Sequence, residues 1–150
     1  MPDQIDYTRL MSLSIFRDLD KNELEIVSKH AFEKSIKKDS ILFMEGMPGE
    51  LLYIIMSCSV AIVKKTKDNK ESLLATMGAN AIIGEMSLID SAPRTATCRT
   101  SEDSVLLVIT KKAFNEILDS NPRIAAKILM SLLKIMSNRL RITTDKKMNE

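Results

Sequence analysis

The chain has 150 residues, 45% of them hydrophobic, which is enough to bury one core and predicts a single domain over residues 1–150. Its 22 basic and 20 acidic residues leave a net charge of +2, too small a field to indicate nucleic acid or an anionic membrane as the main partner. The two cysteines, Cys58 and Cys98, have neither the spacing of a zinc site nor the number of a disulfide framework, and favour reduced thiols.

The N-terminal region has a polar start and then one well-marked helix. The first residues, MPDQIDYTRL, lack the pattern of a signal peptide, and the longest apolar run, LLYIIM at 51–56, is too short to cross a bilayer. We therefore expect a cytoplasmic protein with no membrane partner. Within LDKNELEIVSKHAF, Asp20 and Glu23 form a capping-box pattern, and Leu19 and Leu24 are placed to form a hydrophobic staple.

The middle of the chain is rich in β-strand patterns, and we place a β-roll at about 36–110. From Ser40 onward, apolar runs alternate with turn residues: SILFM, LLYIIM, SVAIVKKT, ESLLATM and SVLLVI. Strands this short and this closely spaced predict an antiparallel sandwich or jelly roll, with KKTKDNKE as a solvated hairpin tip.

The last third of the chain has the pattern of two helices, at about 111–145. Thr110 is placed to cap KKAFNEIL, and Asn121 followed by Pro122 is a second start signal. The apolar stripe at 128–140 is wide, which indicates packing on the β-roll alone or on a second copy as well. The predicted fold class is therefore α+β: an antiparallel, jelly-roll-like β-roll with an N-terminal helix and two C-terminal helices.

The stretch GEMSLIDSAPRTAT, residues 84–97, places a carboxylate and a guanidinium in an apolar segment. If Gly84, Glu85 and Met86 begin a short helical turn, its first amides lack internal partners and can bind an anion. The Arg94 guanidinium adds a planar set of donors suited to two phosphate oxygens. The Glu85 carboxylate would repel an anion, so it is useful only if the ligand also offers a donor, such as a sugar hydroxyl. These features describe a nucleotide whose phosphate and ribose lie close together. The alternative is a structural salt bridge between Glu85 and Arg94.

The same stretch resembles the phosphate-binding cassette of cyclic nucleotide-binding domains. EGMPGELLYIIMSCSVAIV at 45–63 is similar to the family's glycine-punctuated β-roll segment, and the likeness extends from about Phe16 to the end. The resemblance implies a regulatory sensor of cAMP, with cGMP as the second candidate ligand. It implies that Glu85 binds the ribose 2′-hydroxyl and Arg94 the cyclic phosphate. The remaining expected ligand-binding residues of this stretch are Gly84, Met86, Ser87, Thr95 and Thr97.

The closing segment NRLRITTDK, residues 138–146, resembles the dimer helix of the bacterial activators in this family. The resemblance implies adenine contacts for Thr143 and Thr144 and a homodimer through this helix; a solvated helix end is the alternative for the two threonines. Because those activators continue into a helix-turn-helix domain and 150 residues leave no room for one, we expect no DNA-binding domain in this chain. The output would then pass through an unidentified downstream effector protein, or through a segment absent from this chain.

Three positions depart from the family pattern, because Asp39, Cys58 and Asn80 stand where glycine is usual. Asp and Asn tolerate the left-handed conformation, whereas Cys58 is harder to accommodate if its turn needs a positive φ. This departure supports a second hypothesis, a degenerate module that dimerises without binding a nucleotide. Cys98 is either a redox-sensitive thiol or a small buried hydrophobic residue.

No catalytic arrangement is found in the sequence. A β-roll metalloenzyme needs two or three imidazole ligands, and His30 is the one histidine, so we expect no metal. Neither a GxSxG nucleophile motif nor a GxxxxGK[ST] phosphate loop is present. A binding domain that is not an enzyme is therefore the predicted class.

Overall fold

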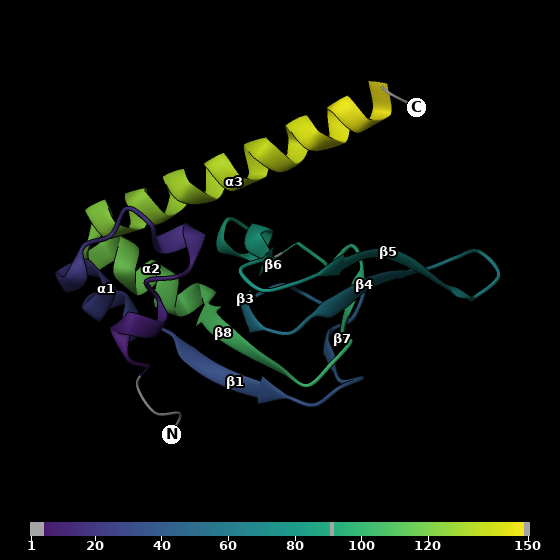
Figure 1. Cartoon of the computed structure of the whole chain (residues 1–150), viewed down its shortest axis with the longest axis horizontal. Coiled ribbons are helices and arrows are strands. Elements are labelled where there is room, and N and C mark those ends of the chain that lie inside the picture. Colours follow the sequence, from purple (N-terminus) through teal and green to yellow (C-terminus); the bar gives the residue numbers. More distant parts are fainter. Residues whose placement is uncertain (1–4, 91, 149–150) are drawn as a thin grey trace.

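The computed structural model describes residues 5–90 and 92–148, and two antiparallel four-stranded sheets dominate this part of the chain (Figure 1). The strand order is β1-β8-β3-β6 in the first sheet and β2-β7-β4-β5 in the second. The strands of the first sheet are β1 (Phe32–Ile36), β3 (Leu51–Ser57), β6 (Ile82–Ile83) and β8 (Ser104–Thr110). Those of the second sheet are β2 (Ile41–Phe43), β4 (Val60–Lys65), β5 (Glu71–Met77) and β7 (Thr97–Thr100).

Helices precede and follow the β-roll, with the starts that the sequence predicted. The helical elements are the 3-10 turns η1 (Tyr7–Arg9), η2 (Ser14–Phe16) and η3 (Glu85–Leu88) and the helices α1 (Lys21–Ser28), α2 (Lys111–Ser120) and α3 (Pro122–Met148). At α1 the Asp20 carboxylate accepts the Glu23 amide at 2.9 Å, and the Glu23 carboxylate accepts the Asp20 amide at 3.1 Å. The Thr110 hydroxyl caps α2 by accepting the Ala113 amide at 2.9 Å. The α+β class with an antiparallel β-roll is confirmed.

Two hydrophobic clusters lie on opposite faces of the first sheet. In β3, Leu52 and Ile54 pack toward the helices, while Tyr53 and Ile55 face the second sheet. In β8, Leu107 and Ile109 join the helical cluster, and Leu106 and Val108 join the cluster between the sheets. Because successive strand residues point to opposite faces, a strand covered on both sides must be apolar throughout. This explains the unbroken runs LLYII and VLLVI.

The start of the β-roll differs from the expectation. α1 ends at Ser28, and β1 occupies Phe32–Ile36, so the roll begins before residue 36 and the helix does not extend to Phe32. The mixed segment FEKSI lacks the apolar run of a central strand, yet it pairs with β8 along its whole length, Phe32 opposite Val108 and Ile36 opposite Ser104. Tertiary pairing therefore decides its conformation where the local pattern is weak.

The three positions where the family usually has glycine all adopt positive φ: 64° at Asp39, 70° at Cys58 and 74° at Asn80. The turn geometry is therefore kept. Asn80 also uses its side chain, whose Oδ1 accepts the Ser14 amide at 2.9 Å while its Nδ2 donates to Ser14 Oγ at 2.6 Å. These bonds hold η2 against the turn between β5 and β6. Cys58 is exposed and carries a Cβ in a region that disfavours it.

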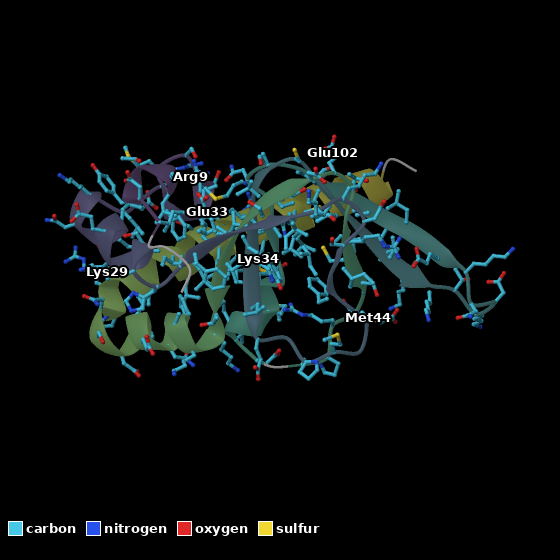
Figure 2. All side chains as sticks on the ribbon, turned by 90° about the horizontal axis from the view of Figure 1, so that it is seen from below. Arg9, Lys29, Glu33, Lys34, Met44 and Glu102 are labelled. Carbon is cyan, nitrogen blue, oxygen red and sulfur yellow. The ribbon has the colours of Figure 1, made fainter. Side chains whose placement is uncertain are left out.

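The N-terminal turns are attached to the β-roll by charge as well as by apolar packing. Arg9 in η1 forms an ion pair with Glu33 in β1, and both are labelled in Figure 2. Ile15 and Phe16 of η2 are each 1% exposed and belong to the helical cluster.

Within the described part of the chain, no helix combines the length and the apolar character that crossing a membrane requires.

The wide apolar stripe of α3 is only partly covered. Ile128 and Leu132 are buried on the helical cluster, whereas Leu133 and Leu140 are 60% and 69% exposed. In Figure 1 the yellow end of α3 projects beyond α2 along the side of the β-roll where β6 lies. The homodimer expected through this helix stays a prediction, because a single chain does not test it.

Candidate functional site

The segment from Gly84 to Ala96 connects β6 to β7 and is anchored to the loop that precedes β3. The Arg94 amide donates to Met47 O at 2.7 Å, and Arg94 O accepts the Gly46 amide at 2.8 Å. Pro48 and Pro93 form the adjacent bridge. The backbone of Arg94 is therefore held in place by a loop that lies far away in the sequence.

The Arg94 side chain is only partly satisfied by the protein. Its Nη2 donates to Leu51 O at 2.9 Å, and its Cζ lies 4.3 Å from the centre of the Phe43 ring. Its Nε is buried and has no hydrogen-bond partner in the described structure. Burial lowers the pKa of the Arg94 guanidinium, although the charges of Tyr53, Cys98 and Glu85 act in the opposite direction. A desolvated cation with a free donor is a site that an anion would stabilise.

Two glycines make room for this guanidinium. Gly84 has φ 78°, and a Cβ there would overlap Nη1 of Arg94. A Cβ at Gly49 would lie 3.0 Å from Cζ of Arg94. The close approach and the positive φ together require glycine at Gly84, whereas a side chain at Gly49 would force the guanidinium to shift slightly.

Glu85 pairs with α3 rather than with Arg94. Its Oε1 lies 3.4 Å from Nη1 of Arg139, and Nη2 of Arg139 donates to Ile82 O at 3.2 Å. The structural salt bridge between Glu85 and Arg94 considered from the sequence is therefore absent. Arg139 was missed by sequence reasoning, although it lies in the NRLRITTDK segment, one helical turn before Thr143.

A cavity of about 430 Å³ opens beside Glu85 and Arg94. Its charged lining residues are Glu85, Asp90, Arg94 and Arg139, and its apolar lining residues include Phe43, Ile62, Met77 and Ile82. This size falls within the range of small-molecule sites, about 300–1,000 Å³. A lining that offers cations, carboxylates and apolar side chains suits a ligand with an anionic group, a hydroxyl and a flat apolar part.

Residues 33–121 match the family model described as "Cyclic nucleotide-binding domain". The chain belongs to the cyclic nucleotide-binding domain family. The chain is similar to the crystal structure of a cyclic nucleotide-binding domain from Methylobacillus flagellatus, with a TM-score of 0.85 and 28% identity, covering 93% of this chain and 81% of that one. The fold and the family resemblance are therefore confirmed together.

Two further relatives of this cyclic nucleotide-binding domain are regulators. The "CRP-like cAMP-activated global transcriptional regulator" of Mycobacterium tuberculosis is 29% identical over 91% of this chain and 59% of its own length. The c-di-GMP responsive global regulator of Xanthomonas campestris has a TM-score of 0.72 and 28% identity, covering 85% of this chain and 63% of that one. The chain spans about half to three fifths of the length of the curated relatives it matches.

These relatives correct the expected set of partners. The expectation of no DNA-binding domain and of a separate effector protein is wrong, because the matching relatives are transcriptional regulators and this chain corresponds to only part of each. The length of 150 residues was the wrong ground for that inference. The relatives are named as regulators, and that this domain is not an enzyme stays a prediction. The cytoplasmic location stays a prediction.

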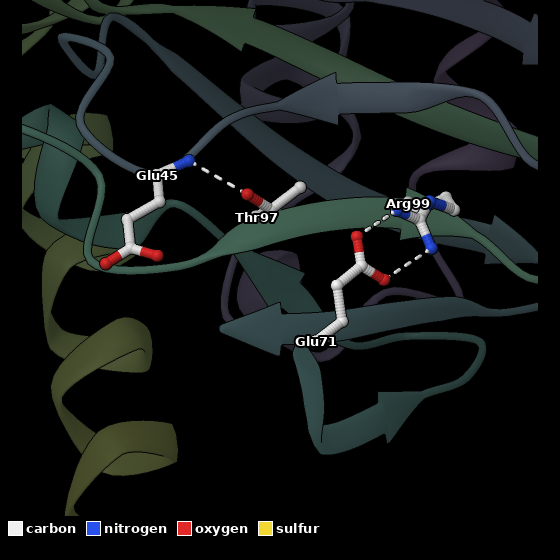
Figure 3. A network of polar contacts seen from close by, with 4 residues as sticks. All are labelled: Glu45, Glu71, Thr97 and Arg99. Atoms are coloured by element: carbon white, nitrogen blue, oxygen red, sulfur yellow. Dashed lines mark hydrogen bonds and ion pairs between the residues drawn. The ribbon is translucent and has the colours of Figure 1, made fainter. Parts of the chain in front are cut away.

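The residues expected to bind the nucleotide are brought together to different degrees. Gly84, Glu85, Met86, Arg94 and Thr95 all line the cavity. Thr97 does not line it, and its hydroxyl instead accepts the Glu45 amide at 3.0 Å (Figure 3). The side chains of Ser87, Thr143 and Thr144 lie outside the described residues.

The two cysteines differ in environment. Cys98 is fully buried between the sheets, and burial raises the pKa of its thiol to about 12. Of the two readings of Cys98, the structure therefore favours the small buried hydrophobic residue over the redox-sensitive thiol. Cys58 is exposed in the turn between β3 and β4.

Proposed function

We propose that this domain is a cyclic nucleotide sensor whose ligand is cAMP, with cGMP as the second candidate. The observation that carries the proposal is the buried, unpartnered Nε of Arg94, a residue that lines a cavity of about 430 Å³. A cyclic phosphate would accept from Nε and add the counter-charge that the desolvated guanidinium lacks. The family membership and a relative described as cAMP-activated support the same ligand class.

The rest of the cavity would hold the sugar and the base. Glu85 accepts hydrogen bonds when ionised, so the ribose 2′-hydroxyl is a suitable donor for it. Ile62 and Met77 line an apolar wall on the β4–β5 side, where a purine would lose contact with water. Thr95 is exposed beside Arg94, and its hydroxyl can donate a hydrogen bond to a base or accept one from it. Guanine therefore stays a second candidate base beside adenine.

The pairing of Glu85 with Arg139 suggests how binding would be transmitted. A ligand hydroxyl on Glu85 would compete with Arg139 for the same carboxylate, and a phosphate would offer Arg139 another partner. Either change alters the link between the η3 segment and α3, so the ligand would shift the population of α3 positions. Coupling free energies of this kind are about 1–3 kcal/mol. Because the matched relatives are transcriptional regulators, we propose regulation of transcription as the output of the whole protein.

Isothermal titration of the purified chain, refolded to remove any carried nucleotide, tests the ligand. We expect saturable binding of cAMP, one molecule per chain, and weaker binding of cGMP. Cyclic di-GMP is titrated in parallel, because one relative is described as responding to it. Absence of binding by all three nucleotides to a folded, empty chain would favour the alternative, a degenerate module that keeps the fold without a ligand.

A further inference from the structure

A second cavity, of about 320 Å³, lies between α3 and the N-terminal segment that carries η2. It shares no lining residue with the cavity at Arg94. The residues that matter for its chemistry are Arg17, Asp18, Ser131, Lys134, Asn138 and Arg141. This cavity is therefore a separate site, and the role proposed above for Glu85 and Arg94 does not account for it.

The charge of this cavity is unbalanced. Arg17, Lys134 and Arg141 line it, with Asp18 as the one carboxylate among its lining residues. None of the three cations forms a salt bridge with another described residue. Like charges gathered in one concave site focus a positive potential, which raises the local concentration of anions.

Neutral hydrogen-bond donors, Ser131 and Asn138, also line the cavity. Ser131 lines it although the residue is only 6% exposed, which makes it one of the few buried polar residues of the described chain. Asn138 lies about two helical turns further along α3 and also lines the cavity. Buried hydroxyl groups normally have hydrogen-bond partners, and an anion in the cavity would accept from Ser131 as well as from the cations.

The start of each wall of the cavity is anchored to the rest of the domain. Ser14, at the start of η2, is bound through its amide and its hydroxyl to Asn80. Lys127 of α3 donates to Glu23 of α1 at 2.7 Å, which joins the two helices. These contacts position η2, next to Arg17, and the first turns of α3 before an anion binds, which reduces the reorganisation that binding requires there.

We propose that this cavity binds a small, multiply charged anion, of the chemical class of a phosphate or diphosphate group on a soluble molecule. Arg17 and Arg141 offer planar forks that match phosphate oxygens, and Lys134 adds a compact charge. The concave shape and the volume of about 320 Å³ favour a small molecule over an extended polyanion. A net charge of only +2 also argues against a broad nucleic-acid surface.

The test uses inorganic pyrophosphate as the probe, titrated calorimetrically into the full chain carrying Arg94→Ala, so that the site at Arg94 cannot contribute. We expect one saturable site per chain. Adding Arg17→Ala and Lys134→Ala should weaken binding about tenfold or more, because two charge-assisted contacts are lost. The matched control adds Lys67→Ala and Lys70→Ala in the exposed β4–β5 hairpin, which changes the net charge equally and should leave the affinity within about twofold.

A further variant gives a result that misfolding cannot imitate. Asp18→Asn removes the carboxylate of the cavity and should tighten pyrophosphate binding, because a like-charge repulsion disappears. The proposal is overturned if pyrophosphate does not saturate, if the hairpin control weakens binding as much as the cavity variant, or if Asp18→Asn weakens it.

Discussion

Arg94 and Arg99 lie five residues apart, but their guanidinium groups differ in their partners, because Arg99 pairs with a carboxylate and Arg94 does not. Arg99, in β7, makes a two-pronged contact with Glu71 in β5, with Nη2 at 2.6 Å and Nη1 at 3.0 Å from the carboxylate oxygens (Figure 3). This contact raises the pKa of Arg99. The Arg94 guanidinium contacts the Leu51 carbonyl and the Phe43 ring, and its buried Nε has no hydrogen-bond partner in the described structure. Burial lowers the pKa of Arg94.

The difference separates a structural arginine, Arg99, from Arg94, for which we propose a role in ligand binding. Arg99 is satisfied by its own chain, so a ligand would have to break an existing ion pair. Arg94 is desolvated without a carboxylate counter-ion, so an anionic ligand adds an interaction and breaks none that the described residues make with Nε. An unpaired cation inside a cavity therefore points to a ligand more strongly than the charge alone does.

The largest effect is expected from Arg94→Ala, which should lower cAMP affinity about 100-fold or more because the charged partner of the phosphate is removed. Arg94→Lys keeps the positive charge but loses the Nε donor, so its cAMP affinity should lie between those of the wild type and Arg94→Ala. Arg99→Ala is the matched control and should change affinity by less than about threefold. Calorimetric titration of the three variants measures this order, and equal losses for Arg94→Ala and Arg99→Ala would remove the distinction.

Gly84→Ala should reduce both stability and affinity. A Cβ there overlaps Nη1 of Arg94, and the φ of 78° adds a cost of about 1–2 kcal/mol for a residue with a side chain. Gly78→Ala is the control, since its Cβ would meet nothing within 4 Å. Urea unfolding and cAMP titration of both variants test this. If Gly84→Ala behaves like Gly78→Ala, the close contact with Arg94 does not shape the site.

Cys58→Gly should stabilise the domain by up to about 1 kcal/mol, since glycine adopts the φ of 70° without steric cost. The gain is reduced by the greater freedom of glycine in the unfolded chain. cAMP affinity should be unchanged, because Cys58 does not line the cavity. Thermal unfolding monitored by circular dichroism measures the shift, and a lower melting temperature would show that the side chain contributes more than its strain costs.

The smallest effect concerns the pH dependence of the Arg99 pair. The hydrogen bond from Arg99 lowers the pKa of Glu71 in the folded state, so the pair stabilises the fold above the unfolded-state pKa of about 4.3. That contribution is lost as the pH falls through the lower folded-state pKa. Urea unfolding of the wild type and of Glu71→Gln should therefore differ near neutral pH and converge in acid. A difference that persists unchanged in acid would contradict this.

Local sequence signals predicted the elements that are defined by near neighbours. The capping box of α1, the Thr110 cap of α2 and the β4–β5 hairpin each depend on residues a few positions apart, and the structure has all three. The apolar runs of β3 and β8 were equally visible, because a strand buried on both faces must be apolar at every position. The weakly patterned β1 was missed at its start.

The sequence by itself determined the class of the fold, the family, and the identity of Gly84, Glu85 and Arg94 as one group, because these depend on residue types at short spacing. The tertiary structure alone decided which charges meet. Glu85 pairs with Arg139 from 54 residues away, and Arg94 is left without a carboxylate while Arg99 finds Glu71. Charge pairing depends on distances between segments that folding brings together, and these distances are set by how the two sheets and α3 pack.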